Sequence, residues 1–198
     1  MRTVVVGGQA RDVGKTSVIA GIITALPQWN WTAVKITRFG PEEAGAYGNS
    51  YALEEQQEPG ESTDTARFLA AGARRALWLR VAEGRLREAL PALRAAIAAA
   101  ESLILESNRI LGFLRPHLFL MVLNPLRAEF KPSARAFFAC ADAYLVVGGM
   151  GTGIPARLQA RAPSGTEHGQ ECPSLLAGKP CFQVGPGCFV TDELLSFM

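Results

Sequence analysis

Short apolar runs alternate along the chain with segments whose apolar residues recur at helical spacing. Runs rich in Val, Ile and Leu are typical of buried strands, and the helical spacing is typical of amphipathic helices. The predicted strands cover residues 4–6, 32–37, 76–81, 102–105, 118–123, 144–147 and 180–184. The predicted helices cover residues 16–26, 62–72, 85–100, 132–140 and 191–197. This order predicts one α/β domain over residues 1–198, with a mostly parallel central sheet and helices on both faces.

A glycine-rich loop joins the first predicted strand to the first predicted helix. Gly7 and Gly8 follow the strand, and Gly14, Lys15 and Thr16 lead into the helix. A helix N-terminus has unpaired backbone N–H groups and partial positive charge, so it attracts phosphate. In such a loop the lysine reaches the β- and γ-phosphates and the threonine hydroxyl ligates Mg²⁺. The strand, loop and helix therefore predict the P-loop nucleoside triphosphate hydrolase fold.

The spacing of this loop departs from the usual pattern. That pattern has four residues between its first glycine and Gly-Lys-Thr. Here five residues separate Gly8 from Gly14, and Gln9 holds the position expected for glycine. A chance Gly-Lys-Thr after a strand is therefore the alternative interpretation. We predict nucleotide contacts from Gly8, Gln9, Ala10, Arg11, Asp12, Val13, Gly14, Lys15, Thr16 and Ser17.

Two acidic residues are candidates for a magnesium site. Glu106 ends the apolar run 103–105. In phosphate-loop proteins an acid that ends a buried strand beside the first strand faces Mg²⁺, directly or through water. Asp64 lies in the first turn of a predicted helix, where an acid either points at a metal or simply favours the helix dipole. With Thr16, these two acids form the predicted metal-ligand set.

Two further polar residues lie near predicted strand ends, where ligands of parallel α/β sheets gather. Lys35, in the strand 32–37, is either a site residue or an edge charge that reaches solvent. Asn124 follows the strand 118–123, and its amide either contacts a nucleobase edge or forms a turn with Pro125. The candidate catalytic residues are Lys15, Lys35 and Glu106, and Asn124 is a candidate nucleotide contact.

Two segments show no clear period. Residues 39–62 contain four glycines, two prolines and six glutamates, so we expect a lid over the nucleotide or, alternatively, a surface insertion. Residues from 148 onward are mostly loop-like, and we expect them to line the base or substrate pocket. A zinc site is a further alternative for this part of the chain, because four possible zinc ligands lie close together in sequence: His168, Cys172, Cys181 and Cys188. Their spacing, however, includes no Cys-x-x-Cys motif.

Composition excludes several other classes of protein. The 198 residues are 48% hydrophobic and 19% charged, which is typical of a globular chain with a sizeable core and not of a disordered one. The net charge of +2 provides no strong field for nucleic acid or a membrane surface. No apolar run reaches membrane-spanning length, and the N-terminus enters a predicted strand at once, so we expect a cytoplasmic protein.

These motifs together resemble the branch of P-loop proteins that contains dethiobiotin synthetase and the molybdopterin-guanine dinucleotide accessory protein MobB. The five-residue insert and the ending Asp12-Val-Gly-Lys-Thr16 are similar to the dethiobiotin synthetase loop. Ser62-Thr63-Asp64-Thr65 followed by Ala71-Gly72-Ala73 is similar to the MobB pattern. Lys35 and the strand-ending Glu106 are similar to residues of both families. The resemblance covers about residues 3–110.

The resemblance implies that Thr16, Asp64 and Glu106 hold Mg²⁺ and that Lys35 contacts substrate or phosphate. It also implies ATP or GTP, or the diphosphate, as the nucleotide and a homodimer as the assembly. After Glu106 this chain has Ser107-Asn108-Arg109, whereas dethiobiotin synthetase has a glycine-rich run and MobB has Gly-Phe-Lys.

Three functions follow as expectations. The first is Mg²⁺-dependent nucleotide binding and hydrolysis in a MobB-like accessory role in molybdenum cofactor biosynthesis, with a cofactor-biosynthesis protein as partner. The second is a dethiobiotin-synthetase-like, ATP-dependent ligase with a small-molecule substrate. The third is a non-catalytic nucleotide-binding module. None of the three calls for nucleic acid or a membrane as a partner.

Overall fold

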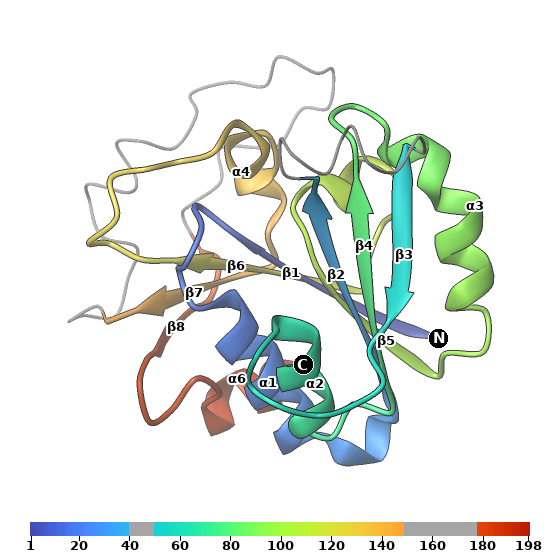
Figure 1. Ribbon diagram of the computed structural model, residues 1–198. Coiled ribbons are helices and arrows are strands. Elements are labelled where there is room, and N and C mark those ends of the chain that lie inside the picture. Colours follow the sequence, from blue (N-terminus) through green and yellow to red (C-terminus); the bar gives the residue numbers. More distant parts are fainter. Residues whose placement is uncertain (40–49, 149–177) are drawn as a thin grey trace.

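The computed structural model describes residues 1–39, 50–148 and 178–198 (Figure 1). The strands are β1 (Arg2–Gly8), β2 (Trp31–Arg38), β3 (Tyr51–Glu55), β4 (Arg75–Val81), β5 (Ser102–Glu106), β6 (Leu118–Leu123), β7 (Ala143–Val147) and β8 (Cys181–Val184). The α-helices are α1 (Lys15–Ala25), α2 (Asp64–Ala70), α3 (Leu86–Ala96), α4 (Pro132–Phe137) and α6 (Asp192–Phe197). Three short 3-10 helices are η1 (Pro27–Trp29), η2 (Arg109–Gly112) and η3 (Phe138–Cys140). Every predicted strand and helix is present, with bounds that differ by a few residues.

The described strands form one sheet in the order β3-β4-β2-β5-β1-β6-β7-β8. Every neighbouring pair is parallel except β3 and β4, which are antiparallel. β1, which leads into the glycine-rich loop, lies between β5 and β6. Because parallel strands end at the same edge of a sheet, the segments that follow β1, β2, β5 and β6 meet there. This confirms the predicted α/β class with a mostly parallel central sheet.

Helices cover both faces of the sheet (Figure 1). One face packs against α1, α2 and α6 through Ile19, Phe68 and Leu194. The other face packs against α3 and α4 through Leu93 and Ala134. Successive residues of β1 contribute to the two apolar clusters in turn, as expected for a strand that is buried on both faces. The two clusters fix the strand ends, and with them the site, in place.

The segment predicted as an irregular, lid-like loop contains a strand, so the prediction of a loop is wrong over that part. Tyr51–Glu55 form β3, which pairs with β4 at the edge of the sheet. Acidic residues are depleted in strands, which hides β3 in the sequence. Their charges are matched by β4: Arg80 forms an ion pair with Glu54, and Arg75 donates two hydrogen bonds of 2.8 Å to Glu55. Charged side chains on an edge strand also discourage pairing with another sheet.

Parts of both irregular segments lie outside the described residues, namely 40–49 of the predicted lid and 149–177 of the predicted loop-rich C-terminal part. The described end of the C-terminal part contains β8 and α6, as predicted. The hydroxyl of Thr191 caps α6 by accepting a hydrogen bond of 3.2 Å from the Leu194 N–H. Within the three described ranges, no helix has both the length and the apolar character needed to cross a membrane.

Replacing Glu55 with glutamine is expected to lower the free energy of unfolding at neutral pH by about 0.2–1 kcal/mol, the range for an exposed ion pair. Hydrogen bonds from Arg75 hold the pKa of Glu55 below its ordinary value. A carboxyl whose pKa is lowered by folding stabilises the protein above its unfolded pKa, and that contribution is lost as the pH falls through the folded pKa.

The difference between the Glu55→Gln protein and the parent should therefore disappear in acid. Urea unfolding followed by circular dichroism at neutral and acidic pH measures it. Glu61→Gln, at an exposed position, is the matched control and should leave stability unchanged at both values. A Glu55→Gln difference that persists undiminished in acid would contradict the assignment.

Candidate functional site

The glycine-rich loop connects the carboxyl end of β1 to the first turn of α1. Gly14 precedes α1 in the left-handed conformation with φ of 97°, which favours glycine. A Cβ on Gly8 would lie only 2.8 Å from the side chain of Lys15, so glycine leaves room for that lysine. Among the described residues, no side chain caps α1. The N–H groups of its first turn therefore remain able to bind an anion.

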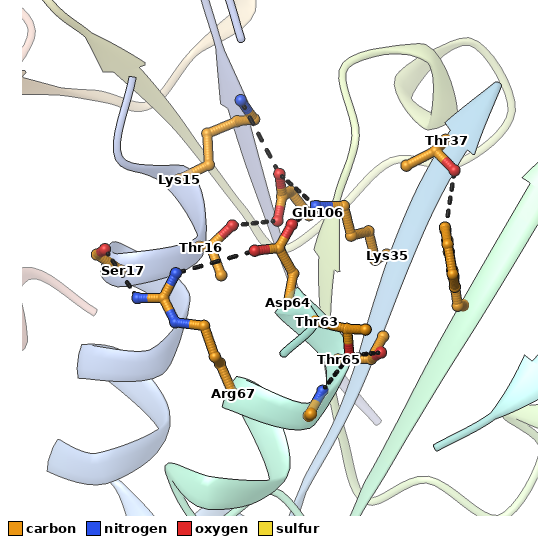
Figure 2. A network of polar contacts seen from close by, with 12 residues as sticks. Lys15, Thr16, Ser17, Lys35, Thr37, Thr63, Asp64, Thr65, Arg67 and Glu106 are labelled. Carbon is orange, nitrogen blue, oxygen red and sulfur yellow. Dashed lines mark hydrogen bonds and ion pairs between the residues drawn. The ribbon is translucent and has the colours of Figure 1, made fainter. Parts of the chain in front are cut away.

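Lys15 and Thr16 meet Glu106 beside this first turn (Figure 2). The Thr16 hydroxyl donates a hydrogen bond of 3.1 Å to Glu106 Oε2. Lys15 Nζ lies 3.9 Å from Glu106 Oε1 and donates a hydrogen bond of 3.0 Å to the carbonyl oxygen of Ala10. Glu106 is only 7% exposed and pairs with Val6 across β5 and β1. The strand-ending acid therefore lies beside the first strand, where the sequence placed it.

Lys35 and Asp64 complete the cluster (Figure 2). Lys35 pairs with Glu106 across β2 and β5, and its Nζ lies 3.9 Å from Glu106 Oε1. The same ammonium forms an ion pair with Asp64, the first residue of α2. Arg67, one turn later, lies 3.9 Å from Asp64 and donates a hydrogen bond of 3.3 Å to Ser17 Oγ. Asp64 therefore lies in the first turn of a helix, as one of its two predicted roles requires, and forms an ion pair there; its role as a metal ligand stays a prediction.

The charges of this cluster depend on one another. Burial lowers the pKa of Lys35 below its ordinary value; the Glu106 carboxylate opposes this fall, and the charge of Lys15 adds to it. The Lys35 ammonium lies near both Asp64 and Glu106, so the position between these carboxylates already holds a positive charge. Carboxylate and hydroxyl oxygens are the donors that Mg²⁺ prefers. The oxygen set of Thr16, Asp64 and Glu106 therefore fits Mg²⁺.

A cleft of about 1230 Å³ contains this cluster. The predicted site residues that line it are Gly8, Ala10, Arg11, Asp12, Val13, Gly14, Lys15, Thr16, Ser17, Lys35, Asp64 and Glu106. Two predicted nucleotide contacts, Gln9 and Asn124, are not among its lining residues. The cleft also reaches past the loop to residues that the sequence argument did not select.

Gln9 explains the unusual spacing of the loop. Its side chain is fully buried, and its Nε2 donates to the carbonyl oxygens of Arg127 and Glu129 at 3.1 and 3.3 Å. Its Oε1 accepts a hydrogen bond of 2.8 Å from the Asn124 N–H, and its carbonyl oxygen accepts one of 2.8 Å from the Lys131 N–H. Gln9 therefore connects the end of β1 to the segment 124–131 by hydrogen bonds. Its side-chain amide points to the backbone of that segment and not into the cleft.

Asn124 and Asn108 have roles that differ from the sequence argument. Asn124 Oδ1 accepts a hydrogen bond of 2.9 Å from the Leu126 N–H, which is the turn geometry considered as its alternative role. Asn108, which was not selected, forms two hydrogen bonds of 2.9 Å with the N–H and C=O of Gly8. A Cβ on Gly7 would approach Asn108 Oδ1 to 2.2 Å, so glycine is required there. The position of Asn108 just after a predicted strand end was the signal that could have found it.

Other residues missed by the sequence argument lie around the same cleft. Arg67 joins α2 to the first turn of α1, as described above. Arg38, Arg109 and Lys131 line the cleft beyond the loop. Arg38 ends β2, Arg109 closely follows the end of β5, and Lys131 directly precedes α4. A cation near a strand end was the signal that could have found Arg38 and Arg109, whereas Lys131 is distant from the end of β6.

The zinc alternative gains no support from the described part of the chain. In residues 1–39, 50–148 and 178–198, no three His, Cys, Asp or Glu side chains form a group that could hold a metal ion. Cys181 is half-buried and Cys188 is exposed. His168 and Cys172 lie outside the described residues.

Comparisons with known proteins give structural similarities only. No protein-family model matches the sequence, and the search of curated proteins gives no match. The "apo" form of LpxK from Aquifex aeolicus in complex with ATP has 17% identity and a TM-score of 0.49, over 92% of this chain and 53% of that one. HypB from Helicobacter pylori in complex with nickel has 14% identity and a TM-score of 0.45, over 98% of this chain and 82% of that one. This chain thus spans about half the length of LpxK. Similarity of this degree transfers no activity.

Replacing Gln9 with glutamate, which has the same shape, is expected to destabilise the protein by about 1–3 kcal/mol. The carboxylate cannot donate to the carbonyl oxygens of Arg127 and Glu129, so these hydrogen bonds are lost and a buried charge is introduced at position 9. Thermal and urea unfolding measure the change. Gln28→Glu, at an exposed position, is the control and should behave like the parent. Equal stability of the Gln9→Glu and Gln28→Glu proteins would show that Gln9 does not tie the segment 124–131 to β1.

Proposed function

We propose that this protein binds a nucleoside triphosphate together with Mg²⁺ and hydrolyses it. The observation that carries the proposal is the 3.1 Å hydrogen bond between Thr16 and Glu106 at the N-terminus of α1. It joins the hydroxyl of the Gly-Lys-Thr motif to the acid that ends the neighbouring strand. Lys15 lies beside the same carboxylate, so phosphate-binding and metal-binding groups converge at one point.

The side chains have distinct roles in this proposal. The backbone N–H groups of the loop and of the first turn of α1 bind the phosphates. Lys15 offsets the negative charge that develops on the transferred phosphoryl group. Thr16, Asp64 and Glu106 hold Mg²⁺, which neutralises charge on the β- and γ-phosphates when bound. Lys35 contacts phosphate or a second substrate. When Mg²⁺ is bound, Lys35 shares its carboxylate partners, Asp64 and Glu106, with the metal.

The MobB-like accessory role in molybdenum cofactor biosynthesis is the biological function that we propose first. Support comes from Asp64 of the MobB-like segment, which reaches the phosphate-loop cluster through Lys35. A homodimer and a protein partner belong to this proposal. A cytoplasmic location belongs to it as well.

A ligase similar to dethiobiotin synthetase is the second candidate. The observation that favours it is the size of the cleft, about 1230 Å³, which exceeds the roughly 300–1,000 Å³ of a typical small-molecule site. Space remains beside Lys35 for a second substrate. The two candidates differ in turnover, since a small substrate would accelerate phosphate release only in the ligase.

Replacing Lys15 with alanine is expected to weaken nucleotide binding about 10- to 100-fold, as the loss of a charge-assisted hydrogen bond to phosphate predicts. Displacement of a fluorescent nucleotide by ATP, GTP, CTP and their diphosphates measures affinity and base preference in one experiment. Arg87→Ala, at an exposed position on α3, is the control. If the Lys15→Ala protein binds nucleotide as tightly as the parent, the site is wrong. A preference for GTP supports the MobB-like role, and a preference for ATP supports the ligase.

We expect Mg²⁺ to increase the nucleotide affinity of the parent protein. Replacing Glu106 with glutamine is expected to reduce this increase about tenfold or more, because the metal loses a charged partner. Binding measured in EDTA should change much less. The same displacement titration with and without Mg²⁺ separates the two effects. Glu101→Gln, at an exposed position, is the control. An unchanged Mg²⁺ dependence in the Glu106→Gln protein would remove this residue from the metal site.

A further inference from the structure

The far end of the cleft is lined by cations that the proposed nucleotide site does not use. Arg38 ends β2, Arg109 begins η2 just after β5, and Lys131 lies one residue before α4. β2 and β5 are neighbours in the sheet, and β6, which precedes Lys131, lies on the other side of β1. The three side chains therefore come from three separate segments that meet at the same edge of the sheet.

This end of the cleft lies on the side opposite α1. The phosphate loop leads into α1, which packs on one face of the sheet together with α2. Lys131 leads into α4, which packs on the other face, and Figure 1 shows α4 across the strand ends from α1 and α2. The hydrogen bond from the Lys131 N–H to Gln9 holds this segment against the end of β1. Lys131 thus lies on the side of the strand ends that carries α4, whereas Lys15 begins α1 on the other side.

Among the described residues, Arg38 has an acidic partner, whereas Arg109 and Lys131 form no ion pair. Glu83 forms an ion pair with Arg38, and both side chains are more than half exposed. Within the described residues, no ion pair or side-chain hydrogen bond is formed by Arg109 or Lys131. Glu129 also lines the cleft and is exposed. Arg109 is half-buried, and a cation that is removed from water without a partner is costly unless an anion joins it.

The electrostatic environment agrees with this description. Burial lowers the pKa of Arg109, the charge of Arg38 lowers it further, and Glu83 opposes the change. Burial also lowers the pKa of Lys131, and the charge of Lys15 adds to that effect. Glu129 opposes the fall of the Lys131 pKa. Arg38 is thus close enough to repel both Arg109 and Lys131, and Lys131 is close enough to repel Lys15. An anion bound among them would relieve this repulsion.

We propose that Arg38, Arg109 and Lys131 form a second subsite in the cleft, which binds the carboxylate or phosphate group of a small anionic ligand while nucleotide occupies the phosphate loop. This inference rests on the proposed nucleotide site and adds the substrate class to it. The size of the cleft leaves room for both ligands. A ligand in this subsite has its anionic group held by these three cations, beside the nucleotide in the phosphate loop.

Arginine modification by phenylglyoxal tests the subsite in the unaltered chain. The protein is saturated with Mg²⁺ and a non-hydrolysable ATP or GTP analogue, so that added anions do not enter the phosphate loop. Inorganic phosphate or a dicarboxylate such as glutarate is then added, and mass spectrometry follows modification at each arginine. Arg115, which is exposed and does not line the cleft, is the internal reference.

We expect one of the two anions, present at about four times its own dissociation constant, to protect Arg109. The modification of Arg109 should then be about fivefold slower relative to that of Arg115, as mass action requires. Protection by phosphate alone assigns a phosphorylated ligand, and protection by glutarate alone assigns a carboxylate. In the Lys131→Gln protein, the anion concentration needed for protection should rise, whereas Arg87→Gln should leave it unchanged. Absence of protection by either anion would overturn the proposal.

The remaining outcomes separate this proposal from the nucleotide site. Full protection of Arg109 by the nucleotide analogue alone would assign the cations to the nucleotide and overturn a second subsite. If the analogue fails to bind but phosphate or glutarate still protects Arg109, the proposed nucleotide site is wrong and the anion subsite stands. If the analogue binds and neither anion protects, the nucleotide site stands and the anion subsite is wrong.

Discussion

The parallel register of β2, β5 and β1 is the constraint on which the site depends. Glu106 pairs with Lys35 on one side and with Val6 on the other, so the carboxyl ends of three strands are level at this point. A carboxylate, an ammonium and the start of the phosphate loop consequently lie together, although they are distant in sequence. Because a slip of one residue would turn Glu106 toward the opposite face of the sheet, the buried apolar residues of β5 fix the chemistry as well as the fold.

Two amide side chains, one buried (Gln9) and one half-buried (Asn108), then hold the loop against these strands. Asn108 binds both polar groups of the Gly8 backbone, and Gln9 binds the backbone of the segment 124–131. Each amide satisfies groups that would otherwise be buried without partners, which is where a hydrogen bond contributes most. The loop therefore has little freedom at its first residues. That rigidity allows Lys15 and the first turn of α1 to present their donors in a fixed position.

Most of the fold and the central part of the site could be predicted from the sequence, because they follow from local patterns. Apolar runs mark the strands, and the Gly-Lys-Thr ending marks the loop that leads into α1. β3 could not be predicted, because its glutamates are compatible with a strand only through Arg75 and Arg80 on β4. The role of Gln9 was equally hidden, since its partners lie more than a hundred residues away. Long-range pairing of polar groups leaves no local signature.

The charges around Lys15 have partners within the protein, whereas the charge of Arg109 has none among the described residues. Asp64 and Glu106 already have Lys35 and Lys15 as partners, so the proposed binding of Mg²⁺ and phosphate would exchange one set of ion pairs for another. Such an exchange avoids leaving a buried charge unpaired at any stage. Arg109 has no such partner among the described residues. The charges of the proposed nucleotide site are thus paired in advance, whereas the charge of Arg109 would be balanced by the anion that we propose for the second subsite.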